Sequence, residues 1–226
     1  MKKIILFLIF SFFSFSNSLS HTDHYKQLNY LEYELFRNNQ IIGFHKYNFE
    51  RNLDNLKVKS IVEFEITKLG VNLYNYIAES EEIYKDGFFH SFKSKTKQNK
   101  KDKYVNISIK DKKDLLIDGS SFKGEGSRNF IVGTWWNHEI IKKKAQISAI
   151  SGRIIFQNVE FLGKEVIKIG EKNYNSLHFR FTSSDKNLPD KKKLDTHIWY
   201  EEDSFLWLKA AFDKTGYWEY RIKTYR

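Results

Sequence analysis

Apolar and polar residues alternate along most of the chain from residue 29 onward. Residues 57–66 place valine, phenylalanine and isoleucine on one face and lysine and glutamate on the other, and only Ser60 and Ile61 break the pattern. The same period of two returns in residues 88–95, 105–110, 177–181 and 206–212. A period of two predicts β-strands, and a sheet with one solvent-exposed face is typically antiparallel.

Short turn signals separate these runs. They include Asp86-Gly87, Asp118-Gly119 and residues 213–216, and Pro189 is the only proline. Asp-Gly pairs suit hairpin turns because glycine accepts a positive φ. The spacing predicts an all-β meander of roughly ten strands. A sheet of that size must curl, so we expect one curved antiparallel sheet or half-open barrel.

One segment departs from the alternation. Residues 134–144 read TWWNHEIIKKK, which favours a short helix that Thr134 would cap and whose terminal lysines suit the helix dipole. Its tryptophans and isoleucines would face the concave side of the sheet. We therefore predict a single short helix in an otherwise β domain.

The first residues predict export. Two lysines precede an apolar run over residues 4–15, and the Ser-Leu-Ser at residues 18–20 fits the small-x-small pattern of a cleavage site. An uncleaved anchor is the alternative, but a span needs roughly 20 apolar residues. The sequence predicts a signal peptide over residues 1–20, a single exported β domain over residues 21–226, and a periplasmic location in a Gram-negative bacterium.

Composition limits how this domain is stabilised and what it contacts. There is no cysteine, so 20 Phe, 13 Tyr and 5 Trp must supply the core. The net charge is +10 and is mostly lysine, in a residue usage that suggests an AT-rich genome. Basicity therefore argues only weakly for a nucleic-acid partner. An exported basic protein meets anionic lipid headgroups, so membrane-surface contact is possible, although solubility alone would explain the charge.

The sequence contains no convincing catalytic or metal-binding motif. Residues 120–123, 184–186 and 214–216 resemble, in order, the three motifs of penicillin-recognising serine enzymes. That chemistry needs its serine at the start of a helix, whereas Ser120 follows an Asp-Gly turn. Carboxylates two apart on strands face solvent, and the histidines show no metal spacing. We predict no catalytic residue, no metal and no cofactor, and expect a protein that is not an enzyme, with a hydrolase of dispersed residues as one alternative.

Several strings resemble a known family. Residues 33–43, 69–76 and 82–87, followed by Trp136-Asn137 and residues 151–153 and 199–201, are similar to segments of the exported proteobacterial domain-of-unknown-function family 6134. Family 3108 is more distantly similar. The resemblance implies a curved antiparallel half-barrel, related in shape to periplasmic lipoprotein carriers. It implies no catalytic residue, because the activity of these families is uncharacterised.

A curved sheet lined by aromatic side chains offers an apolar groove for an acyl chain or another hydrophobic segment. An ordinary aromatic core is the plainer interpretation. A structural partner in envelope assembly, which adds a strand to an open sheet edge, is the other alternative. The predicted groove residues are Trp135, Trp136, Phe179, Trp199 and Tyr200, with Asn137 and Arg153 as polar contacts.

Overall fold

The computed structural model describes residues 25–226. The signal peptide expected over residues 1–20 lies outside the described residues. The described chain forms one sheet of fifteen strands, which confirms the curved antiparallel sheet but makes the predicted number of roughly ten strands wrong. Among these residues, no helix is long and apolar enough to span a membrane.

The strands of the sheet follow one another along the chain with few interruptions. They are β1 (Tyr30–Arg37), β2 (Gln40–Asn52), β3 (Asn55–Lys68), β4 (Val71–Lys85), β5 (Phe88–Gln98), β6 (Lys101–Ile109), β7 (Asp114–Gly119), β8 (Lys123–Ser127), β9 (Ile131–Val132), β10 (Ala145–Ile147), β11 (Ile154–Ile169), β12 (Lys172–Ser183), β13 (Asp195–Glu201), β14 (Trp207–Asp213) and β15 (Tyr217–Tyr225).

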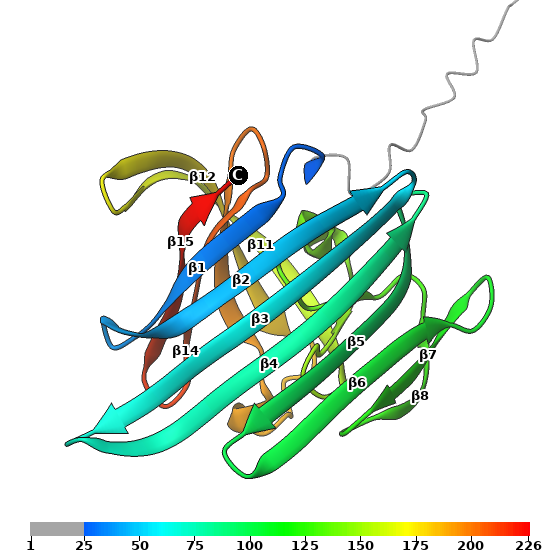
Figure 1. Cartoon of the computed structure of the whole chain (residues 1–226), viewed down its shortest axis with the longest axis horizontal. Helices are drawn as coiled ribbons and strands as arrows, with labels where there is room; N and C mark the ends of the chain where they lie inside the picture. Colours follow the sequence, from blue (N-terminus) through cyan, green and yellow to red (C-terminus); the bar gives the residue numbers. More distant parts are fainter. Residues whose placement is uncertain (1–24) are drawn as a thin grey trace, which may run out of the picture.

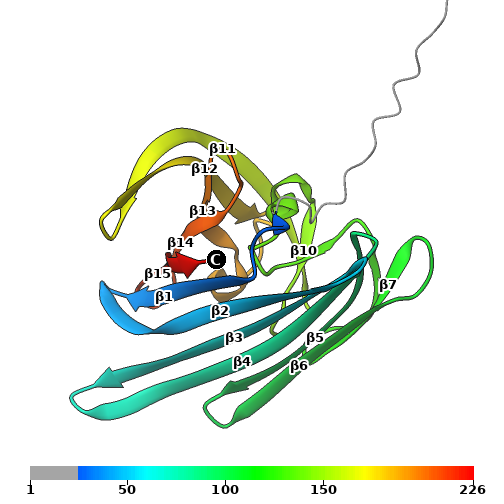
Figure 2. The same cartoon turned by 45° about the horizontal axis from the view of Figure 1, so that its top comes forward.

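The first and last strands pair with each other at the middle of the sheet. From this β1–β15 pair, one arm continues through β2 to β8 and the other through β14 to β9, and every pair is antiparallel except β9 with β10. The arms curve toward each other (Figures 1 and 2). The Ser121 amide donates to the Ser151 carbonyl at 2.9 Å, which joins the end of one arm to the other. The result is a barrel-like shell.

The strands missing from the sequence prediction are short. β7, β8, β9 and β10 have between two and six residues each. A period of two is hard to recognise over so few positions, and β8 reads KGEGS with no apolar residue. Tertiary pairing, rather than local pattern, makes these segments strands.

The predicted helix is smaller than expected and begins later. A 3-10 helix runs over His138–Lys142, and a second short one covers Asp190–Lys192. The Asn137 side chain accepts a hydrogen bond from the Glu139 amide and caps the first, so the prediction of Thr134 as the cap is wrong. Ile140 is fully buried, and the segment does face the concave side of the sheet.

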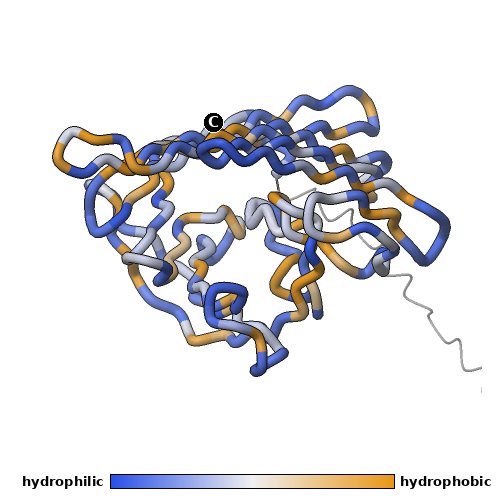
Figure 3. The backbone as a smooth tube through the Cα atoms, turned by 90° about the horizontal axis from the view of Figure 1, so that it is seen from below, coloured by the Kyte–Doolittle hydropathy of each residue, from blue (hydrophilic) through white to orange (hydrophobic). Residues whose placement is uncertain are grey.

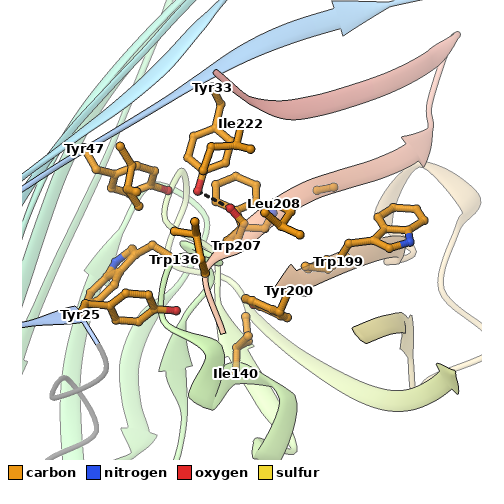
Figure 4. Packing of buried hydrophobic residues seen from close by; sticks show 14 of the residues in the cluster. Tyr25, Tyr33, Tyr47, Trp136, Ile140, Trp199, Tyr200, Trp207, Leu208 and Ile222 are labelled. Carbon is orange, nitrogen blue, oxygen red and sulfur yellow. Dashed lines mark hydrogen bonds between the residues drawn. The ribbon is translucent and has the colours of Figure 1, made fainter. Parts of the chain in front are cut away.

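The core is largely aromatic. Figure 4 shows Tyr33, Tyr47, Trp136 and Trp207 gathered between the arms. Tyr33 stacks on Trp207 with ring centroids 4.1 Å apart, and its hydroxyl donates to the Trp207 carbonyl at 2.7 Å. Seen edge-on, the broad layer of the sheet lies over the rest of the chain (Figure 3). The interior between them contains the candidate site.

Candidate functional site

Residues 133–137, here called the inner segment, cross the concave side of the sheet. The Tyr47 hydroxyl donates to the Thr134 carbonyl at 2.6 Å, and the Tyr200 hydroxyl donates to the Trp135 carbonyl at 2.9 Å. Trp135 has a left-handed backbone with φ of 58°, a conformation that costs free energy in a residue other than glycine. Two tyrosines from opposite arms therefore hold a strained tryptophan inside the shell.

A buried carboxylate anchors the same segment. Glu82 on β4 accepts hydrogen bonds from the Tyr84 hydroxyl at 2.5 Å, from Trp136 Nε1 at 3.0 Å and from the Thr134 hydroxyl at 3.4 Å. Burial raises the pKa of Glu82 to about 7, against the opposing effect of these donors. Asn137 Nδ2 donates to the Tyr84 hydroxyl at 3.2 Å. Because its oxygens are occupied by side chains, Glu82 fixes the inner segment in place.

A hollow of about 240 Å³ lies between the inner segment and the sheet; we call it the inner cavity. Ser60, Ser80 and Ser94 sit in register on three neighbouring strands of its wall. Their short side chains leave space where phenylalanine or tyrosine would fill it. The other wall residues are His45, Tyr47, Val62, Tyr76, Ala78, Glu79, Thr96, Gly133, Thr134, Trp135, Gln146, Ser148, Ala149, Ile150, Ile155, Leu194 and Tyr220.

His45 is the unusual residue of this wall. Both of its ring nitrogens are buried and have no hydrogen-bond partner among the described residues. Its ring lies 4.2 Å from that of Tyr47, and Trp207 and Tyr220 contact it edge-on. Burial lowers the pKa of His45 to about 3, so the ring is neutral at pH 7. A neutral imidazole offers one N–H donor and one acceptor nitrogen, and both are unused here.

A second hollow adjoins the inner cavity at Trp135. This rim pocket has a volume of about 360 Å³ and shares Trp135 and Leu194 with the inner cavity. Lys193 and Lys214 also line this pocket, together with Asp190, Asp195, Thr196, Phe212 and Asp213. Trp135 therefore forms a wall between an interior space and one with a charged rim.

A third hollow, the end pocket, lies on the other side of β10. Ile147 faces this pocket, while its neighbours Gln146 and Ser148 face the inner cavity. Its volume is about 650 Å³, and Asn137 and Tyr84 of the Glu82 network reach its wall. The inner segment is therefore bordered by hollows on two sides.

The predicted groove residues do not form one surface. Trp135 lines the inner cavity and Asn137 the end pocket. Trp136, Tyr200 and Phe179 are buried in the core. Arg153 donates to the Lys192 carbonyl at 3.2 Å, beside the rim pocket.

Trp199 is also buried and belongs to the core cluster, but its ring has different neighbours. It stacks on His178 with ring centroids 4.1 Å apart, on the outer side of β12 and β13, and Figure 4 shows it directed away from Trp136 and Trp207. His178 also contacts His197 at 2.8 Å and Glu165 at 2.9 Å. Within residues 25–226, no group of three or more histidines and carboxylates is arranged to hold a metal ion.

Comparisons with known proteins give a fold and a family. A family model described as a domain of unknown function, DUF6134, matches residues 33–223, and confirms the resemblance to family 6134. A crystal structure of a beta-barrel-like protein of domain of unknown function DUF1849 from Brucella abortus matches with a TM-score of 0.59. It is 10% identical, over 88% of this chain and 97% of that one. At that identity the likeness concerns fold alone.

A second solved structure, a DUF1329 family protein from Desulfovibrio piger, aligns over 91% of this chain and 88% of its own. It has 11% identity and a TM-score of 0.26. No curated protein matches the chain.

Proposed function

We propose that this chain, which belongs to the DUF6134 family, is a binding protein whose inner cavity holds a small, mostly apolar molecule. The observation that supports this is His45, which lines the cavity and whose two buried ring nitrogens have no hydrogen-bond partner among residues 25–226. A buried polar group without a hydrogen bond costs about 1–3 kcal/mol. A ligand that supplies the missing partner recovers that free energy, whereas ordinary core packing does not.

The same residue indicates the chemistry of the ligand. His45 is neutral at pH 7 because burial holds its pKa at about 3, and among residues 25–226 no lysine or arginine lines the cavity. A carboxylate would therefore enter without a counter-charge, which is strongly unfavourable in a buried site. An uncharged polar group, such as a hydroxyl or a carbonyl, matches the imidazole. We infer a fatty alcohol, an ester or an amide, with its apolar chain against Trp135, Val62 and Ile155.

The neighbouring rim pocket supports a ligand longer than the inner cavity. The inner cavity alone is smaller than the 300–1,000 Å³ of typical ligand sites. Trp135 and Leu194 belong to both hollows, so movement of these two side chains would join them. The charged rim then lies where the ligand meets water. The signal expected over residues 1–20 would place this binding in the periplasm.

The fluorescence of Trp135, which lines the inner cavity, can report ligand binding. Titration of the purified protein with decanol, decane and decanoate at pH 7 should give a saturable fluorescence change with decanol at micromolar concentration. Trp135→Phe should remove most of that change, whereas Trp218→Phe should keep it because Trp218 does not line the cavity. Absence of saturable binding by all three compounds would contradict the proposal.

His45→Phe tests the assigned polar contact. The variant keeps a flat ring but loses both nitrogens, so decanol affinity should fall about tenfold while decane affinity changes little. An unchanged ratio of the two affinities would show that His45 does not contact the ligand.

A further inference from the structure

The hairpin of β3 and β4 extends past its neighbours. Pairing of β2 with β3 ends at Gly43 and Phe64, and pairing of β4 with β5 begins at Tyr76 and Gln98. Beyond these positions, residues 66–74 pair only within the hairpin. We call residues 66–74 the tongue; it projects at the lower left of Figure 1 in cyan.

The tip of the tongue is apolar and exposed. Leu69 is 96% exposed, Val71 60% and Leu73 53%. Leu69 has a left-handed backbone with φ of 51° and precedes Gly70. Such turns favour asparagine or aspartate before glycine, so a leucine here gains nothing from the turn or from packing. An exposed apolar cluster at a projecting end marks a contact surface.

Lysines lie on the hairpin beside the tongue and on the tongue itself. Lys68 belongs to it, and Lys97, Lys100 and Lys101 lie on the adjacent β5–β6 hairpin, whose Asn99 amide donates to the Asn75 carbonyl at 2.9 Å. Within residues 25–226, none of these four lysines takes part in an ion pair. The nearby acids are Glu65, which accepts a hydrogen bond from Asn72, and Asp102. This end of the molecule is therefore positively charged.

We propose that the tongue docks the protein on an anionic lipid bilayer, with Leu69, Val71 and Leu73 among the acyl chains and the lysines at the headgroups. Apolar side chains backed by cations are the combination that binds such surfaces. A second copy of the chain fits less well, because two tongues meeting tip to tip would bring lysines together. No residue of the tongue lines the inner cavity, so the two proposals stand separately.

The opposite end of the sheet supplies a matched control. Leu53, in the β2–β3 turn, is 94% exposed and has the same left-handed φ of 51°. Its surroundings have no surplus of positive charge: Asp54 follows it, the Asp86 amide on the next turn donates to the Asp54 carbonyl at 2.9 Å, and Lys85 pairs with Asn55. The two leucines are about equally exposed, but Leu53 lacks both the surplus of lysines and the exposed valine and leucine that accompany Leu69.

Co-sedimentation of the purified protein with vesicles tests the proposal. Vesicles of phosphatidylglycerol and phosphatidylcholine should bind the protein, pure phosphatidylcholine vesicles should not, and 0.5 M NaCl should release it. Leu69→Ser should weaken binding about tenfold, and each of Lys100→Gln and Lys101→Gln about fivefold. Leu53→Ser should bind as the wild type does.

Three outcomes would overturn the proposal: equal binding to neutral vesicles, equal loss in the Leu53 and Leu69 variants, or concentration-dependent dimers that Leu69→Ser abolishes. Circular dichroism of each variant establishes that it is folded. His45→Phe should leave vesicle binding unchanged, and Leu69→Ser should leave decanol binding unchanged, so failure of one proposal is distinguishable from failure of the other.

Discussion

Acid should destabilise the protein through His45. The ring has an ordinary pKa of 6.5 in the unfolded chain and a pKa of about 3 when folded. Between these two pKa values the unfolded chain binds a proton at His45 and the folded chain does not. The contribution of the neutral ring to the free energy of unfolding is therefore complete above pH 6.5 and is lost as the pH falls toward 3. One pKa unit corresponds to about 1.4 kcal/mol. Lowering the pH from 7 to 5 should remove about 2 kcal/mol through this residue.

Protonation of Glu82 should change the stability of the protein in the opposite direction over the same pH range. Its pKa rises from 4.5 to about 7 on folding, so the folded state holds a proton that the unfolded state releases. The associated stability is complete below pH 4.5 and is lost as the pH rises through 7. Between pH 5 and 7 this loss is also about 2 kcal/mol. In the wild type the two contributions should nearly cancel.

Single variants expose each contribution. Urea unfolding at pH 5, 6 and 7, without added ligand, gives the free energy of unfolding for the wild type, His45→Phe and Glu82→Gln. Relative to the wild type, His45→Phe should become less stable as the pH rises from 5 to 7, and Glu82→Gln more stable. His90→Gln is the control, because that ring lies in the wall of the end pocket and is only half-buried.

The sign of the change is the decisive result. If His45→Phe follows the wild-type pH dependence, the imidazole is protonated or hydrated in the folded state, and the buried neutral ring on which the ligand argument depends does not exist. If both variants shift in the same direction, the carboxyl of Glu82 is ionised in the folded protein at pH 5.

Gly43→Ala should destabilise the protein by more than about 3 kcal/mol in urea unfolding, because a Cβ there would lie 2.0 Å from the Glu63 carbonyl oxygen and force two strands apart. Gly170→Ala, where nothing lies within 4 Å of the added atom, should cost only about 1 kcal/mol for its positive φ; similar losses at both sites would contradict the close approach. Tyr47→Phe should cost about 1–3 kcal/mol by leaving the Thr134 carbonyl without its donor, and a stability equal to the wild type would show that water replaces the hydroxyl.

Long strands were predictable because their faces differ. In β3 the buried positions Val58 and Phe64 alternate with exposed Lys59 and Glu63, as the sequence pattern indicates. The turn at Lys214-Thr215-Gly216 was also predicted correctly, and it lies between β14 and β15. In penicillin-recognising serine enzymes this motif belongs on an inner strand, so its place in a turn argues against that resemblance. Local chemistry is sufficient for these features, because each depends on residues near in sequence.

The inner segment could not be predicted in the same way. Its sequence looks helical, yet Tyr47 and Tyr200, both far from it in the chain, hold Thr134 and Trp135 in non-helical conformations. These hydrogen bonds exist only once the sheet has curved. Only the following turn, His138–Lys142, is free to become helical. Long-range contacts therefore decided where the helix begins.

The cavity, by contrast, does leave a trace in the sequence. Ser60 breaks the alternation of its strand, and in the folded chain it faces inward and lines the inner cavity. His45 follows the same rule: it lies on the inner face of β2 between Gly43 and Tyr47, where an apolar residue would fill the space. A polar residue on the apolar face of a strand costs stability unless it finds a partner. Glu82 has three hydrogen-bond donors among its neighbours, whereas His45 has no partner within the part of the chain that the structure describes. Two interior polar residues of one sheet thus differ: Glu82 holds the inner segment through its hydrogen bonds, and His45 is the residue for which we propose a ligand as the missing partner.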